Sequence, residues 1–313
     1  MVDPSPLSKP LPEQEQPLEA VLSPAARLLH DGLRQRWEKF TGRLARCQTE
    51  LREENVHDLR VSMRRLIAML VMCQAVMPAL KTKGLRREIK AHLDNLDTLR
   101  DTQVMRYFLT KHYRRNESAI PLLTYLEMQE AHLLRKVDHE IGSMQVMSLL
   151  EGVTLLGRTI EASLTGTGIE GVILSVVDEA YADVKWKRVN VNPQDLATVH
   201  AMRIAFKKFR YMLELATPLV PPMPSSRPKV LHHYQGMMGD VQDGVVLLEF
   251  IERFSQENTQ FDVRPVREAS ALELEKRMAY FLARIDRLRL FWRKSPGTRF
   301  PWRSSTGAPP MGA

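Results

Sequence analysis

A fifteen-residue motif occurs twice in this chain, and this repeat constrains the fold more than any other feature. The first copy, "VHDLRVSMRRLIAML", occupies residues 56–70, and the second, "VHAMRIAFKKFRYML", occupies residues 199–213. Five of the fifteen positions are identical, and most of the others are conservative. Internal repeats indicate duplicated structural units that bury their apolar faces against one another. The sequence therefore predicts two related halves.

The repeat continues beyond the motif. Once a one-residue difference in the following loop is allowed, "LRDTQV" (99–104) aligns with "VQDGVV" (241–246). This alignment places Asp101 opposite Asp243. The simplest architecture is two halves of four helices each, whose corresponding faces meet across a shared groove near an approximate two-fold axis.

Helical periodicity covers most of the chain, since apolar residues recur about every 3.6 positions and breaks contain proline or glycine. The segment 118–163 is too long for one ordinary helix, and we expect it to bend or break near Gly142 or Gly152. The predicted helical segments are 24–48, 52–77, 84–113, 118–163, 169–190, 195–217, 228–256 and 264–293.

The two ends of the chain lack this periodicity. Residues 1–22 are proline-rich and polar and are predicted to be a disordered leader, and residues 295–313 are predicted to be a flexible tail. Between them we expect one helical domain, 23–294, made of the halves 23–163 and 169–294. The predicted fold class is all-α, with two pseudo-symmetric four-helix bundles.

The positive charge of the chain is concentrated around the two motifs. The formal net charge is +8, and residues 56–115 hold thirteen Lys or Arg against five Asp or Glu. Residues 186–233 hold eight Lys or Arg against two acids. Such a balance favours an anionic partner: nucleic acid, a membrane surface or another polyanion.

Each motif helix divides into an apolar arc and a basic arc. In the first copy, Val56, Leu59 and Met63 share one arc, whereas the histidine and arginines fall on the other. No acid occurs within residues 59–70, so these charges repel one another unless an anion joins them. A solvated helix face usually mixes both signs. We therefore interpret the basic arcs as an anion-binding groove.

The motifs resemble a known family. "VHDLRVSMRR" followed by "LDTLRD", with a second copy "VHAMRIAFKKFRYMLEL" followed by "MGDVQD", is similar to the CHAD family, the conserved histidine α-helical domain. The resemblance covers roughly residues 23–293. It implies two four-helix bundles around a central basic channel that binds inorganic polyphosphate. Some members of the family associate with polyphosphate granules.

The resemblance also implies which residues face the ligand. Gln242 stands where the first half has Arg100, and His233 stands near the place of Lys90, so we expect the second half to bind more weakly. The motif residues in the implied site are His57, Arg60, Arg64, Arg65, Arg100, His200, Arg203, Lys207, Lys208 and Arg210. The basic segments after the motifs add Arg86, Arg87, Lys90, Lys229 and His233.

Catalytic and metal functions find little support in the sequence. The chain has no glycine-rich phosphate loop and no paired carboxylates suited to acid–base work. "ELEKR" (273–277) departs from the E-x-E-x-K strand of triphosphate-hydrolysing tunnel enzymes. His57 and His200 lie among cations, which repel a metal ion. We expect no catalytic residues, no metal site and no cofactor.

Nucleic-acid binding remains the main alternative, and a helical scaffold that holds an acidic protein segment is a third. Sequence-tolerant single-strand binders interleave aromatic and basic residues, but aromatic residues make up only 7% of this chain. Tyr211 is the only candidate for base stacking on the basic arcs.

Two further features bear on location. No apolar run approaches the roughly 18 residues of a membrane span, and Cys47 and Cys73 have no metal or redox spacing. We therefore expect a cytoplasmic protein. Association with polyphosphate granules is implied only by the resemblance to the CHAD family. The basic segment 284–294 could lie on a membrane surface, but we expect it to pack its apolar side chains, Leu288, Phe291 and Trp292, on the bundle.

Overall fold

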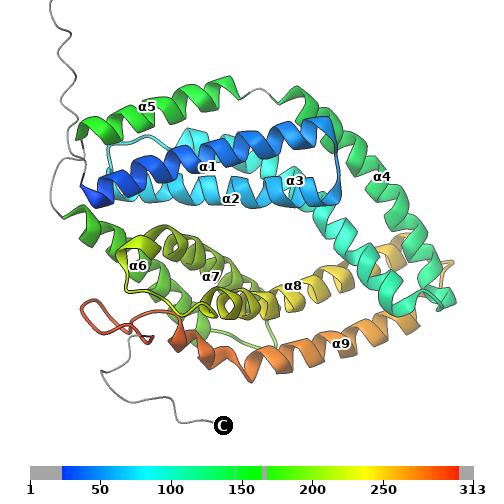
Figure 1. The fold of residues 1–313 in the computed structure, drawn as a ribbon. Helices are drawn as coiled ribbons and strands as arrows, with labels where there is room; N and C mark the ends of the chain where they lie inside the picture. The colour runs from blue at the N-terminus through cyan, green and yellow to red at the C-terminus, as the bar shows by residue number, and fades with distance from the viewer. Residues whose placement is uncertain (1–22, 145, 164–167, 303–313) are drawn as a thin grey trace, which may run out of the picture.

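The computed structural model describes residues 23–144, 146–163 and 168–302, and these ranges form an all-α fold (Figure 1). They contain α-helices, 3-10 turns and loops without a β-strand, and one isolated bridge joins Asn192 and Asp195. The predicted fold class is thus confirmed at the level of an all-helical chain. The predicted leader lies outside the described residues.

The expected break near Gly142 is confirmed, and it divides the segment 118–163 of the first half into two helices. The segment 118–163 breaks after Ser143, close to Gly142, because the backbone of Met144 is extended and ends the helix. In Figure 1, α1, α2 and α3 lie together, α5 runs along α1, and α4 packs on α3. The helices of this half are α1 (Pro24–Thr49), α2 (Glu53–Val76), α3 (Lys83–Tyr113), α4 (Ile120–Ser143) and α5 (Met147–Ser163), with a 3-10 turn, η1 (Glu117–Ala119), before α4.

The second half follows the predicted order, but its last helix ends early. The segment expected to be helical over 264–293 leaves the α-helix at Leu282 and continues as a 3-10 turn. The turn is fixed by two buried tyrosines: the hydroxyl of Tyr181 donates to the carbonyl of Leu288 at 3.0 Å, and that of Tyr234 donates to Ile285 at 2.6 Å. The elements are α6 (Ile169–Val189), α7 (Leu196–Ala216), η2 (Thr217–Leu219), α8 (Arg227–Glu257), α9 (Arg264–Leu282) and η3 (Ile285–Leu290).

The two halves meet in two apolar regions. In the main core, α2 packs on α6 and α7. A second, smaller core joins the distal end of α3, η1 and α4 to α8 and α9, and Met105, Leu122 and Phe250 are buried there. Charged residues from α2, α3, α7 and α8 lie between these apolar regions. Among the described residues, no helix is long and apolar enough to cross a membrane.

The basic C-terminal segment packs on the main core, as expected. Leu288, Phe291 and Trp292 are buried, and the indole N–H of Trp292 donates to Asp178 at 2.7 Å. Phe300, whose ring centre lies 5.0 Å from that of Trp292, also packs on this core. The flexible tail predicted from residue 295 is therefore wrong for residues 295–302, because their aromatic side chains cover the indole. Residues 303–313 lie outside the described part.

This packing makes Trp292 a sensitive point of the fold. The variant Trp292→Ala should lower the free energy of unfolding by about 3–5 kcal/mol, because it leaves a cavity in the core and removes a hydrogen bond. Trp186→Ala is the matched control, since that side chain is 60% exposed, and it should change stability by less than about 0.5 kcal/mol. Urea unfolding followed by circular dichroism measures both. Equal effects of the two variants would contradict the packing described for the C-terminal segment.

Candidate anion-binding cleft

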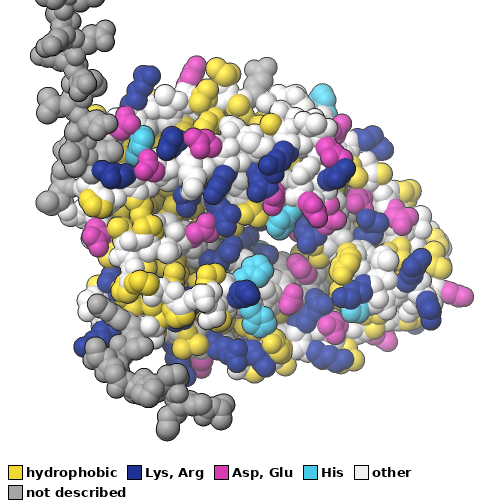
Figure 2. Space-filling view, viewed as in Figure 1, with side chains coloured by type: hydrophobic (Ala, Val, Ile, Leu, Met, Phe, Trp, Pro, Cys, Tyr) yellow, Lys and Arg dark blue, Asp and Glu magenta, His cyan; other side chains and the backbone are white. Residues whose placement is uncertain are grey.

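A charged cleft lies where α2 and α3 of the first half face α7 and α8 of the second. Figure 2 shows an opening near the centre of the molecule, bordered by histidine and Lys or Arg side chains, with Asp or Glu side chains along part of its rim. Charged side chains of the two halves lie close enough to shift one another's pKa values: Arg64 and Asp97 act on Lys207, and Asp101 acts on Asp243. The cleft residues are His57, Arg60, Arg64, Asp97, Arg100, Asp101, Arg203, Lys207 and Asp243.

The first motif is paired with a carboxylate. Arg60 donates to Asp97 Oδ1 from Nε at 2.8 Å, and its Nη2 lies 2.7 Å from the same oxygen. Arg64 reaches both oxygens of Asp97 from Nη2, at 2.7 and 2.8 Å. The motif helix has no acid within residues 59–70, as the sequence shows, and the anion that joins its arginines is a carboxylate from α3. Sequence reasoning missed Asp97, because the acid comes from α3 rather than from the motif helix; its only signal was its place in the "LDTLRD" segment that follows the first motif.

The second motif lacks the equivalent carboxylate. The alignment that places Asp101 opposite Asp243 places Asp97 opposite Gly239. A Cβ atom added to Gly239 would lie 3.9 Å from Arg203 Nε, so this glycine stands beside the arginine as an acid would. Arg203 Nε is buried and has no hydrogen-bond partner within the described ranges.

Lys207 is the second cation of this motif. The pKa of Lys207 is lowered to about 7, mainly by burial and in addition by repulsion from Arg64 and Arg203, and attraction to Asp97 offsets only part of this shift. The described residues contain no ion-pair partner for this ammonium group. The expectation that the second half binds more weakly stays a prediction, although its two motif cations, Arg203 and Lys207, are the ones without a direct ion pair.

The two motif histidines stand at the border of the cleft. His200 Nδ1 lies 2.5 Å from Gln242 Oε1, so the residue that replaces an arginine here fixes the orientation of the imidazole. Partial burial lowers the pKa of His57, and Arg60 and Arg100 lower it further. A neutral His57 in the absence of an anion follows from its cationic surroundings.

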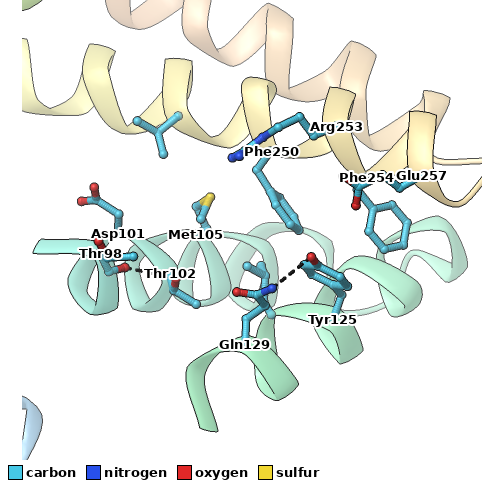
Figure 3. Close-up of a pocket in the computed structure, with 12 residues that line it drawn as sticks. Thr98, Asp101, Thr102, Met105, Tyr125, Gln129, Phe250, Arg253, Phe254 and Glu257 are labelled. Atoms are coloured by element: carbon cyan, nitrogen blue, oxygen red, sulfur yellow. Dashed lines mark hydrogen bonds between the residues drawn. The ribbon is translucent and has the colours of Figure 1, made fainter. Parts of the chain in front are cut away.

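Asp101 and Asp243 form an acidic side of the cleft. Desolvation raises the pKa of each carboxyl group, and the nearby positive charge of Arg203 offsets part of this rise. A pocket of about 310 Å³ opens beyond Asp101 between α3, α4 and α8 (Figure 3), and one of about 240 Å³ opens beyond Asp243 between α3, α8 and α9. Figure 3 shows Asp101 at one end of the first pocket and aromatic rings, among them Tyr125, at the other. The acidic and aromatic lining of this first pocket does not suit phosphate.

Several predicted site residues point elsewhere. Arg65 pairs with Glu214 at 2.9 Å, because it lies on a different side of α2 from Arg60 and Arg64. Arg86 donates to Gln74 at 2.7 Å, and Lys90 pairs with Asp94 at 2.8 Å. Lys208, Arg87, Lys229 and His233 are exposed.

Arg210 and its neighbour also differ from expectation. The guanidinium of Arg210 lies 4.9 Å from the ring centre of Tyr211. Tyr211 is only 8% exposed, so its face is not open to a nucleic-acid base. The suggestion that Tyr211 could stack on a base is therefore wrong, because the ring belongs to the core.

Comparison with known proteins identifies the class to which this architecture belongs. The model of the CHAD domain family matches residues 31–252, and the chain therefore belongs to this family. Its fold is similar to that in the crystal structure of the CHAD domain from the plant Ricinus communis, with a TM-score of 0.62 and 19% sequence identity. The similarity covers 86% of this chain and 91% of that one. A search of curated proteins finds no match.

The pairing of the two motifs predicts opposite effects on stability. Arg60→Ala should lower the free energy of unfolding by about 1–3 kcal/mol, because it removes buried charge-assisted bonds from Asp97, which keeps only Arg64. Lys207→Met should leave stability unchanged or raise it, since it replaces a desolvated ammonium by an apolar chain of similar length. Urea unfolding at pH 7 without added anions measures both. A loss of stability in Lys207→Met as large as that in Arg60→Ala would contradict the assigned pairing.

Proposed function

We propose that this chain binds inorganic polyphosphate in the cleft and does not act on it chemically. The observation that carries the proposal is the pair Arg203 and Lys207, which lie near Arg64 of the other half and form no ion pair or side-chain hydrogen bond among the described residues. Two desolvated cations beside a third repel one another, and an anion placed between them would remove that cost. Membership of the CHAD family supports the same ligand.

Polyphosphate fits the chemistry of the cleft. It is a flexible chain with about one negative charge per phosphate, and it has no nucleobases that a protein could recognise or stack on. Arginine offers a planar fork to phosphate oxygens, and lysine offers a compact charge. Because Arg60 and Lys207 are largely shielded by the protein, contacts to these side chains are stronger than on an open surface. We propose that the protein works in the cytoplasm, and association with polyphosphate granules would follow from the ligand.

Nucleic acid is the weaker candidate. Sequence-independent binding of single strands uses exposed aromatic side chains on which bases stack. In this structure Phe206 and Phe209 are fully buried, and Tyr211 is nearly so. The cleft therefore offers charge without a stacking surface, which favours a polyanion without bases.

Competition between polyanions tests the ligand. Long-chain polyphosphate should bind more tightly than single-stranded DNA or heparin of equal charge at the same salt concentration. By analogy with single strands, the slope of log K against log salt should be about −0.7 per phosphate contact. Calorimetric titration measures these affinities. Equal or tighter binding of DNA would favour the nucleic-acid alternative.

The double variant Arg203→Ala, Lys207→Ala tests the site. Polyphosphate affinity should fall at least about tenfold, because two charge-assisted contacts worth about 1.5–3 kcal/mol each are removed. The matched control is Arg264→Ala, Arg267→Ala, which removes the same charge from two arginines already paired with Asp262 and Glu252. The same loss in both double variants would show that only net charge matters and would refute the cleft as the site.

Lys207 should make binding depend on pH. An anion favours the protonated amine, so affinity should be highest below pH 7 and should fall as the pH rises through about 7. In the absence of ligand, the free energy of unfolding should change with pH in the opposite direction to the affinity. The unfolded lysine stays protonated to about pH 10.4, so stability should rise between pH 7 and that value.

Lys207→Arg isolates this contribution, because arginine stays charged over the whole range. Titrations with long-chain polyphosphate at pH 6.5 and 8.5 should show a smaller change in affinity for this variant than for the natural protein. Equal pH dependence of the two proteins would contradict the role given to Lys207.

A further inference from the structure

Beside the arginines of its motif, the first half of the cleft has an acidic side chain that the second half lacks at the equivalent position. Asp97 bridges Arg60 and Arg64 in the first half, and Gly239 occupies the equivalent position in the second. The repeat therefore contains one motif whose arginines share a carboxylate and one motif whose cations form no direct ion pair among the described residues. This asymmetry has a consequence for the length of the anion that can bind.

The carboxylate of Asp97 has the place and the chemistry of a bound phosphate group. Its two oxygens accept hydrogen bonds of 2.7–2.8 Å from two arginines, as phosphate oxygens would. Arg60 is 6% exposed, so the bonds are well shielded from water. The side chain of Asp97 is itself 31% exposed, and a change of rotamer can carry its carboxylate into solvent.

We propose that Asp97 is an internal competitor for the ligand and makes the cleft selective for long phosphate chains. The inference rests on the proposed binding of polyphosphate. A short anion binds at Arg203 and Lys207 alone, because Asp97 holds the arginines of the first motif. A longer chain, anchored at the second motif, extends to the first and displaces the carboxylate.

Chain length matters because of effective concentration. A separate small anion has to compete with a carboxylate that is tethered next to Arg60 and Arg64. The next phosphates of an anchored chain are tethered as well, and linkage of this kind can raise the apparent affinity by a factor of about 10²–10⁴. Only a chain that is already anchored at the second motif therefore reaches an effective concentration high enough to displace Asp97 from Arg60 and Arg64.

The test compares tripolyphosphate with long-chain polyphosphate by calorimetric titration of the full chain. In Asp97→Asn, the affinity for tripolyphosphate should rise at least tenfold, and that for the long chain should rise less, so the ratio of the two affinities shrinks. Gly239→Asp places a second competitor beside Arg203 and should lower the affinity for tripolyphosphate at least tenfold. These two substitutions are opposite in direction, so the test stands if one variant does not fold.

The control is Asp94→Asn, which removes the same charge from the same helix but from an exposed carboxylate that pairs with Lys90. It should leave the affinity ratio unchanged. If Asp97→Asn lowers both affinities, Asp97 positions the arginines and the inference is wrong; an identical change in Asp94→Asn also overturns it. Failure of the natural protein to bind either chain would refute the proposed function itself, which distinguishes the two failures.

Discussion

The cleft brings the positive side chains of Arg60, Arg64, Arg203 and Lys207 close together, where they are partly buried and repel one another. The pairing of the other charged groups in the cleft depends on how this repulsion is balanced. Two helices, α2 and α7, bring arginine and lysine side chains from separate halves of the chain toward one another. Each charge loses part of its hydration there, and this cost has to be balanced by an opposite charge or by loss of a proton. The first half uses Asp97 for this purpose, and in the second half the pKa of Lys207 falls to about 7.

The apolar cores make this arrangement of charge possible. On one side of the cleft, α2 packs on α6 and α7, and on the other the ends of α3 and α8 close over a smaller core. Burial of these faces supplies the favourable free energy that holds the cations near one another. The aromatic residues of the second motif belong to this packing. The cleft is consequently rich in charge and poor in stacking surfaces, which is the combination that suits a polyanion without bases.

Duplication followed by divergence explains why one cleft contains two kinds of basic site. The positions of Asp101 and Asp243 are equivalent in the repeat and lie together on the acidic side of the cleft. Asp97 and Gly239 are equivalent as well, but only one of them is an acid. A carboxylate in one half and a glycine in the other therefore give the two motifs different direct partners.

The sequence by itself determined the helical character of the chain, the repeat, and the residues that meet in the cleft from the motif helices. Local periodicity suffices for these, since 3.6 residues per turn places Arg60 and Arg64 within about 40° of each other on α2, and Arg64 lies away from the apolar arc of Leu59 and Met63. Only the tertiary structure decided the partners of those residues. Asp97 lies 33 positions from Arg64 and on another helix, and Glu214 lies 149 positions from Arg65. Contacts of this kind depend on how whole helices pack, and no local pattern encodes that.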